Sequence, residues 1–339
     1  MRTSRRTPRW ARLGALSLVL VLFGAACSDD NNDSADKKQA PKTFVVRAGA
    51  HDTKDRNIAV TEFLPEKITV AVGTEVTWSW AETIEPHTAT FAAGGALPPP
   101  GPPDVALFAP TPPAGPFEGT ALVNSGLQPL GPAGAPDMKL TFAKAGSFQY
   151  YCVIHPLMTG TVEVTDDAAA ADTPADVADR GDRELGGFLV EGEAAKKALE
   201  SAEPRKETSG GVTTWFVEMG KTTEHTDVLA FAPTSPEIKA GDKVTFVNNS
   251  SAPHTASFGD VPQDPTDPAA AAPSPGPSPV TLGAGGFFNS GELPPNFPPG
   301  AGPPLAARSF TFNVPKAGAY EFVCILHIPS GMAGSIQAT

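Results

Sequence analysis

The stretch CVIHPLM (residues 152–158) places a cysteine, a histidine and a methionine within a few residues of one another. The stretch CILHIPSGM (324–332) repeats these residue types, with a longer spacer before the methionine. Thiolate, imidazole and thioether groups are ligands that soft transition metals prefer. A tight loop that carries all three returns them to one place in a fold. The two stretches therefore predict two related metal-binding loops in a duplicated chain.

Other strings repeat in the same order with a period of about 170 residues. PHTATF (86–91) matches PHTASF (253–258), so each half has one further histidine upstream of its cysteine, His87 or His254. The remaining matches are NSG at 124–126 and 289–291, and KAG at 144–146 and 316–318. The chain is therefore predicted to be a tandem duplication.

Within each half, apolar residues recur at every second position, which is the period of a half-buried strand. The clearest runs are Ile68/Val70/Val72, Val76/Trp78/Trp80, Phe148/Tyr150/Cys152, Phe310/Phe312 and Tyr320/Phe322/Cys324. Gly and Pro turns bound these short runs, and no helical period occurs inside either repeat. The pattern predicts an all-β protein in which each repeat is an antiparallel sandwich.

Composition narrows the classes further. Among 339 residues, 33 are Gly and 37 are Pro, which excludes a long-helix or coiled-coil protein. Twelve prolines fall between Leu97 and Pro136 and thirteen between Val261 and Pro304, so two long surface insertions are expected at equivalent places. The formal net charge of −12 argues against a nucleic-acid partner, because phosphate binding needs clustered Lys and Arg.

The N-terminal segment is typical of an export signal. Arginines precede an apolar run from Leu13 to Ala26 that is too short to span a bilayer. The run ends at Cys27 and resembles the bacterial lipoprotein signal, in which lipid on the cysteine anchors the mature chain. We expect a signal peptide over 1–26, lipidation at Cys27 and a disordered tether over 27–42, with the protein at the membrane and facing the periplasm or cell exterior. An ordinary cleaved signal is the alternative.

The rest of the chain divides into two domains and a linker. The first sandwich is expected over 43–165 and the second over 212–339. The linker, 166–211, is polar at its start and rich in helix formers from Phe188 to Glu203, where we expect a helix that caps the second sandwich. In this interpretation the two sandwiches are joined only through the linker.

Each repeat supplies two histidines, one cysteine and one methionine, which is the ligand set of a trigonal blue-copper site. The predicted ligands are His87, Cys152, His155 and Met158 at one site, and His254, Cys324, His327 and Met332 at the other.

Both repeats resemble the cupredoxins, the blue copper family. The loop CVIHPLM is similar to the amicyanin loop, and CILHIPSGM has the ligand spacing of the plastocyanin loop. The resemblance implies Greek-key sandwiches that each hold one type 1 copper. Thr88 and Thr255 directly follow the upstream histidines, so we expect a backbone N–H there to reach the cysteine sulfur and tune the redox potential.

Electron transfer is the function that this ligand set favours, because protein side chains fill every coordination position and leave none for a substrate. The partners would then be soluble or membrane-bound redox proteins. His155 and His327 would face outward as electron ports. The docking rim around these ports would consist of Pro156, Leu157, Ile328 and Pro329.

Three alternatives remain at this stage. A copper storage or delivery module would use the same ligands. A two-domain multicopper enzyme of the nitrite reductase type needs further histidines, whereas His51 and His225, the only two left, do not align between the repeats and are interpreted as surface residues. The protein is therefore predicted not to be an enzyme. A Cys152–Cys324 disulfide would leave four histidines unexplained.

Overall fold

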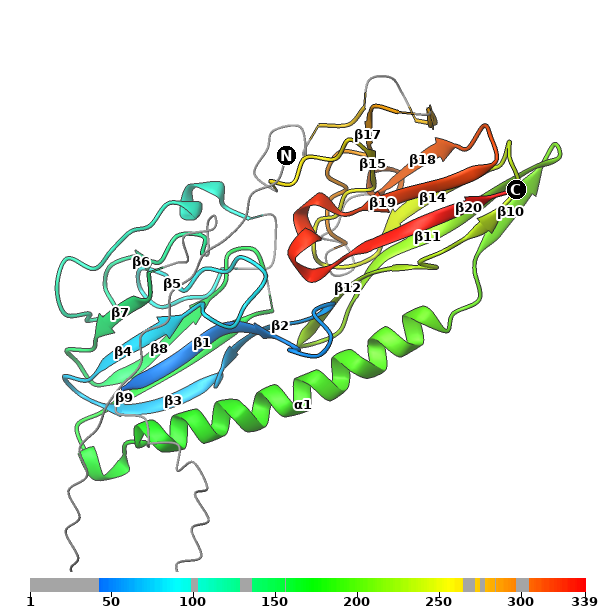
Figure 1. Ribbon diagram of the computed structural model, residues 1–339. Coiled ribbons are helices and arrows are strands. Elements are labelled where there is room, and N and C mark those ends of the chain that lie inside the picture. Colours follow the sequence, from blue (N-terminus) through cyan, green and yellow to red (C-terminus); the bar gives the residue numbers. More distant parts are fainter. Residues whose placement is uncertain are drawn as a thin grey trace, which may run out of the picture. The chain divides into compact units, whose positions relative to one another are not determined.

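The computed structural model shown in Figure 1 describes most of the chain from residue 43 onward. The described ranges are 43–98, 103–128, 136–155, 157–264, 272–274, 278–283, 285–296 and 305–339. The predicted signal peptide, Cys27 and the tether lie outside these residues, as do Pro156 and parts of both proline-rich insertions.

The first repeat forms two facing sheets. One contains β1 (Phe44–His51), β2 (Ile58–Leu64), β4 (Glu75–Ser79) and β7 (Met138–Thr141). The other contains β3 (Lys67–Ala71), β9 (Thr159–Thr165), β8 (Gly146–Tyr151), β5 (Thr90–Phe91) and β6 (Val123–Asn124). The short helices η1 (Val105–Phe108) and η2 (Ala168–Ala170) lie outside the sheets.

The second repeat follows the same plan. Its first sheet contains β10 (Lys206–Ser209), β11 (Val212–Thr222), β12 (Thr226–Ala232), β14 (Lys243–Asn248), β16 (Val280–Thr281) and β18 (Ser309–Asn313). Its second contains β13 (Glu237–Ile238), β15 (Ser257–Gly259), β17 (Phe287–Asn289), β19 (Gly318–Val323) and β20 (Ala333–Ala338). The short helices are η3 (Leu305–Arg308) and η4 (Ile325–Ser330). The predicted all-β tandem of sandwiches is confirmed.

Aromatic side chains fill the space between the sheets. Trp78 lies at the centre of the first core, with its ring 5.4 Å from Phe91 and 5.3 Å from Tyr150. Phe246 takes the corresponding place in the second core and packs edge-on against Phe258 and Phe322. Edge-to-face pairs of this kind add to the stabilisation from burial. Each core thus fixes the sheets whose ends carry the predicted metal ligands.

The sheets are mixed, so the predicted fully antiparallel pairing is wrong in part. In the first repeat, β1 is antiparallel to β2 but parallel to β4. The chain crosses to the other sheet in β3 before it returns in β4, which reverses its direction once more. The second repeat has the equivalent parallel pair, β11 with β14.

One sheet runs through both repeats, because β2 pairs with β12. The strands are antiparallel, and Asp227 lies opposite Ala59. These two residues are equivalent in the duplication, since each stands four residues before the matching Phe63 or Phe231. Equivalent residues that face each other across antiparallel strands indicate a local pseudo-twofold axis. The prediction that only the linker joins the sandwiches is therefore wrong.

The linker helix is longer than predicted. Helix α1 spans Pro174–Glu200 and begins with a capping box, in which Thr173 and Asp176 each bond the other's backbone N–H. Its residues Phe188 and Leu189 pack against strands of the first repeat, and Phe188 also stacks on His225 of the second. Figure 1 shows α1 running along the strands β1, β2 and β12. The helix therefore supports the shared sheet and does not only cap the second sandwich.

Candidate metal centres

Each metal-binding loop joins two neighbouring strands of one sheet. Cys152 comes directly after β8 and Met158 directly before β9, and the Cys152 N–H donates to the Met158 carbonyl at 2.9 Å. In the second repeat the Cys324 N–H donates to the Met332 carbonyl at 3.0 Å. This backbone bond closes the loop so that its histidine lies over the cysteine.

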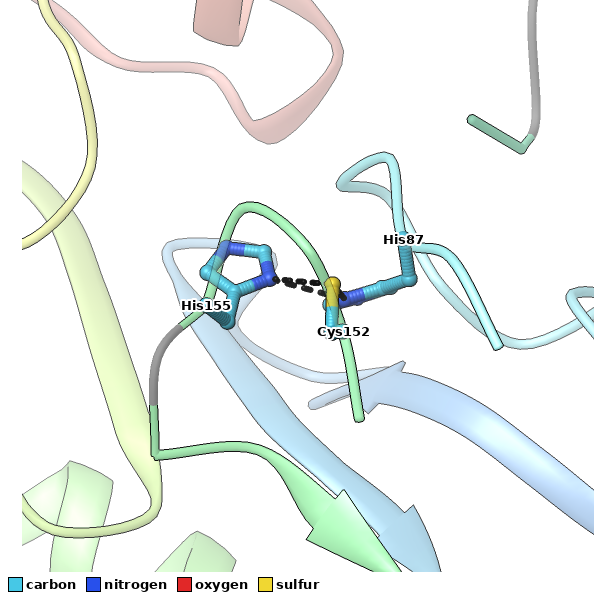
Figure 2. A group of neighbouring side chains, drawn as sticks. All are labelled: His87, Cys152 and His155. Atoms are coloured by element: carbon cyan, nitrogen blue, oxygen red, sulfur yellow. Dashed lines mark hydrogen bonds between the residues drawn. The ribbon is translucent and has the colours of Figure 1, made fainter. Parts of the chain in front are cut away.

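The first triad consists of His87, Cys152 and His155 (Figure 2). The two Nδ1 atoms lie 3.0 Å apart, and the Cys152 Sγ lies 3.5 Å from Nδ1 of His155 and 4.0 Å from Nδ1 of His87. His87 comes from the β4–β5 connection, as its place in PHTATF predicts. Three donors, two from the loop and one from the β4–β5 connection, therefore face one point.

The second triad, His254, Cys324 and His327, has the same geometry. Its two Nδ1 atoms lie 3.1 Å apart, and the Cys324 Sγ lies 3.3 Å from Nδ1 of His327 and 3.7 Å from Nδ1 of His254. In either triad, a point equidistant from the three donors lies about 2 Å from each. This is close to the zinc–nitrogen bonds of about 2.0–2.1 Å and a little shorter than the zinc–sulfur bonds of about 2.3 Å in proteins. The residues present therefore fit a trigonal metal ion.

The methionines lie in the same loops. Met158 and Met332 are fully buried and belong to the same apolar clusters as Cys152 and Cys324. A buried thioether at the closed end of the loop suits a weak axial ligand. Six of the eight predicted ligands thus gather in two triads, and each of the two methionines ends the loop of its own triad.

The electrostatic environment favours thiolates. Burial alone would raise the pKa of Cys152, but His155 and His87 lower it well below its usual range. The same balance lowers the pKa of Cys324 beside His327 and His254. A thiolate is the form of cysteine that binds metals.

Backbone amides stabilise these thiolates as expected. The N–H of Thr88 donates to the Cys152 Sγ at 3.4 Å, and the N–H of Thr255 donates to the Cys324 Sγ at 3.3 Å. The hydroxyl of Thr88 accepts from the N–H of Val153 at 2.9 Å. The predicted N–H contacts to sulfur are confirmed, and the threonine side chains also hold the two loop segments together.

The repeated Asn-Ser-Gly motif has a structural role that the sequence did not show. Asn124 accepts a bond from Thr90 at 2.8 Å and donates to the carbonyls of Leu107 and Ala109. The hydroxyl of Ser125 accepts from the N–H of Ala89 at 2.9 Å. The motif therefore ties the proline-rich insertion to the segment that carries His87, and the second repeat has the equivalent bonds.

Two glycines that the sequence analysis missed position the upstream histidines. Gly49 lies at a bulge in β1 with φ +78°, and Gly220 lies at the matching bulge in β11 with φ +77°. A Cβ at Gly49 would lie 2.3 Å from Nε2 of His87, and one at Gly220 would lie 2.7 Å from Nε2 of His254. In the sequence, the single glycine inside each of these strands was the feature that could have indicated a bulge or a close contact.

We expect Gly49→Ala to weaken copper binding at the first triad by about 10- to 100-fold, because the new methyl displaces the His87 ring. Gly73→Ala is the control, since Gly73 has a similar φ of +86° but no atom within 4 Å of an added Cβ. Copper titration of each variant measures the effect. Equal losses in both variants would show that backbone strain, and not the histidine contact, is responsible.

The prediction that the loop histidines face outward is wrong. His155 and His327 have exposed fractions of 7% and 6%. Nε2 of His327 lies 3.4 Å from Oε1 of Glu85, which belongs to the other repeat. Of the predicted rim, Leu157 and Pro329 are exposed and Ile328 is half-buried. The pseudo-twofold axis explains the difference, because it brings equivalent loops toward each other.

The structure also decides the disulfide alternative and places the two remaining histidines. Cys152 and Cys324 are free thiols in different clusters, so the disulfide alternative is wrong. His51 bonds the carbonyl of Glu82 through Nδ1, and His225 pairs with Glu191 at 2.8 Å. Neither histidine belongs to a His/Cys/His triad. The fold and the donors together define a tandem β-sandwich protein with two buried His/Cys/His triads that could each hold a metal ion.

Comparison with known proteins adds little beyond this. No protein-family model and no curated protein matches the chain. It is similar to a solved Cu(I) form of an amicyanin variant, with 23% identity over 38% of this chain and 87% of that one and a TM-score of 0.24. It is also similar to oxidized plastocyanin from Dryopteris crassirhizoma, with 21% identity over 37% of this chain and 99% of that one and a TM-score of 0.23.

Proposed function

We propose that the protein binds two type 1 copper ions and transfers electrons. The observation that carries this proposal is the pair of triads, each made of one cysteine sulfur and two imidazole Nδ1 atoms, with a buried methionine at the end of the same loop. A bound copper ion would supply reversible one-electron chemistry, and this ligand set suits both of its oxidation states.

The chain's own residues prepare these sites. Nε2 of His87 bonds Thr83 at 3.1 Å, and Nε2 of His254 bonds Ser250 at 2.7 Å, so each ring presents Nδ1 to the cysteine. Burial of all four residue types excludes water from the donors. A site that is already shaped for its metal rearranges little when its charge changes, which favours rapid electron transfer.

Copper storage or delivery is the competing function, and metal exchange distinguishes it. For an electron carrier, we expect an intense visible band that disappears and returns on one-electron reduction and oxidation, with copper retained in the presence of a chelator. Rapid loss of copper to the chelator or to an apo-acceptor protein would contradict the electron-transfer proposal and favour delivery. We also propose that the protein is an electron carrier and not an enzyme.

We also propose that the protein lies outside the cytoplasm on a lipid anchor. Its support is the sequence pattern at residues 1–27. No helix in the described part of the chain is long and apolar enough to cross a membrane. The partners would be other redox proteins at or near that membrane.

Changing Cys27→Ala tests the anchor. We expect the variant to leave the membrane fraction, because the segment that follows Cys27 has no large apolar side chain. Membrane fractionation with detection of the protein measures this. Retention of the variant at the membrane would contradict lipidation at Cys27.

A further inference from the structure

The two triads face a common buried region that lies between the repeats. An oxygen of Glu85, a ring nitrogen of His155 and an oxygen of Asp227 all lie within 4.8 Å of one another. Nε2 of His327 lies 3.4 Å from the same glutamate. One glutamate therefore has a loop histidine from each triad as its neighbour.

Both carboxylates are buried and rigidly held. Glu85 is 3% exposed, and its backbone is fixed by Thr83, whose hydroxyl bonds both the N–H and the carbonyl of Glu85. Asp227 is fully buried in β12 and accepts bonds from Thr222 and Ser251. Burying a carboxylate costs free energy unless the charge is paired or hydrogen-bonded. Two buried carboxylates at this place therefore indicate that they have a role in the protein.

In each loop histidine, the two ring nitrogens face different groups. In His327, Nδ1 faces Cys324 at 3.3 Å and Nε2 faces Glu85. In His155, Nδ1 faces Cys152, and Figure 2 shows the other ring nitrogen pointing away from the triad. The outer nitrogens are thus free to donate to a carboxylate while the inner nitrogens bind a metal.

The duplication does not account for the two acids. Glu85 precedes Pro86-His87, whereas the equivalent residue before Pro253-His254 is Ala252. Asp227 lies opposite Ala59, its equivalent in the first repeat. Each repeat therefore contributes one acid that the other lacks, and both acids lie where the loops meet.

We propose that Glu85, with Asp227, bridges the two metal centres, so that an electron delivered to one centre passes to the other within the same molecule. The inference rests on the proposed function. The reduced centre loses one electron and the oxidised centre gains it; no bond breaks, and the bridging protons stay on the histidine Nε2 atoms. Glu85 and Asp227 are positioning residues in this exchange, because Glu85 contacts His327, Asp227 lies within 4.8 Å of His155, and neither acid belongs to a His/Cys/His triad.

The contact with Glu85 can be tested without copper. In the copper-free protein, the Nε2 proton of His327 should give an imidazole resonance protected from solvent exchange. We expect Glu85→Ala, which introduces the residue that the second repeat has there, to abolish this protection. Glu82→Gln is the control, because Glu82 lies on the same loop but is exposed and pairs with Arg47. Protection that survives in Glu85→Ala would overturn the bridge.

The exchange itself is measured by pulse reduction of the copper-loaded protein with substoichiometric electrons. We expect redistribution between the centres at a rate independent of protein concentration. Glu85→Ala should slow it by about tenfold, with both coppers still bound, and Glu85→Gln should restore most of the rate because its carbonyl still accepts from His327. Glu82→Gln should leave the rate unchanged.

The outcomes separate the two proposals. Absence of copper, or of reversible reduction, overturns the proposed function and the bridge with it. Two reversible centres whose exchange depends on protein concentration, or is the same in Glu85→Ala, overturn only the bridge. A third copper that is lost in Glu85→Ala also overturns it, because the carboxylates would then hold a cation.

Discussion

Changing Cys152→Ser should remove one of two copper ions and about half of the visible absorption, and Cys324→Ser should remove the other half. The thiolate supplies the short metal bond and the charge-transfer colour, and a serine hydroxyl at neutral pH supplies neither. Each triad draws its three donors from its own repeat, so the remaining centre keeps a complete ligand set. Metal analysis and visible spectroscopy measure both effects.

The control for these variants is Cys27→Ser, which removes a cysteine outside both triads and should retain both copper ions. A double variant, Cys152→Ser with Cys324→Ser, should be colourless. If either single change abolished both sets of bands in a folded chain, the copper would be shared between the repeats, and two independent type 1 sites would be the wrong description.

The second large effect concerns Glu62, which lies in β2 beneath α1. Burial raises its pKa to about 9, and the nearby Glu66 adds to the shift. Between the ordinary glutamate pKa and this value, the unfolded chain is ionised while the folded chain stays protonated. Folding stability therefore falls as pH rises through this window. Glu62→Gln removes the loss and should stabilise the copper-free protein by about 3 kcal/mol at pH 7.

Denaturant unfolding at pH 5 and pH 7 measures how the free energy of unfolding changes with pH and so checks the direction of this effect. The gain from Glu62→Gln should be small at pH 5 and larger at pH 7, because the cost of keeping the folded glutamate protonated rises by about 1.4 kcal/mol for each pH unit above its unfolded pKa. Glu237→Gln, at an exposed strand position, is the control and should show no such trend. An equal gain at both values would mean that packing, and not ionisation, separates the variant from the natural chain.

The ligands were predictable because metal chemistry restricts residue types. Few combinations of Cys, His and Met at short spacing serve another purpose, and the duplication gives each ligand an independent second occurrence. The strands that contain Trp78 and Tyr150 were also predictable, because one side of each strand faces a core and apolar residues therefore alternate along it. The sequence therefore predicted both sandwiches and the contents of both triads.

The joining of the repeats was not predictable in the same way. Pairing of β2 with β12 uses backbone N–H and carbonyl groups, which every strand carries, so no side chain marks it. The extent of α1 did have a signal, because Thr173-Pro174-Ala175-Asp176 is a capping box that the linker-like composition obscured. The sequence also contained a signal for Glu85, because the residue before Pro-His-Thr is a glutamate in the first repeat and an alanine in the second.

Titration of the purified, metal-free chain with copper, followed by visible spectroscopy, tests the central claim most directly. Each triad fits one ion, so the charge-transfer absorption should rise linearly to two equivalents of copper per chain and then stay constant. Saturation at one equivalent, or binding of two equivalents without an intense visible band, would contradict the assignment of two type 1 centres.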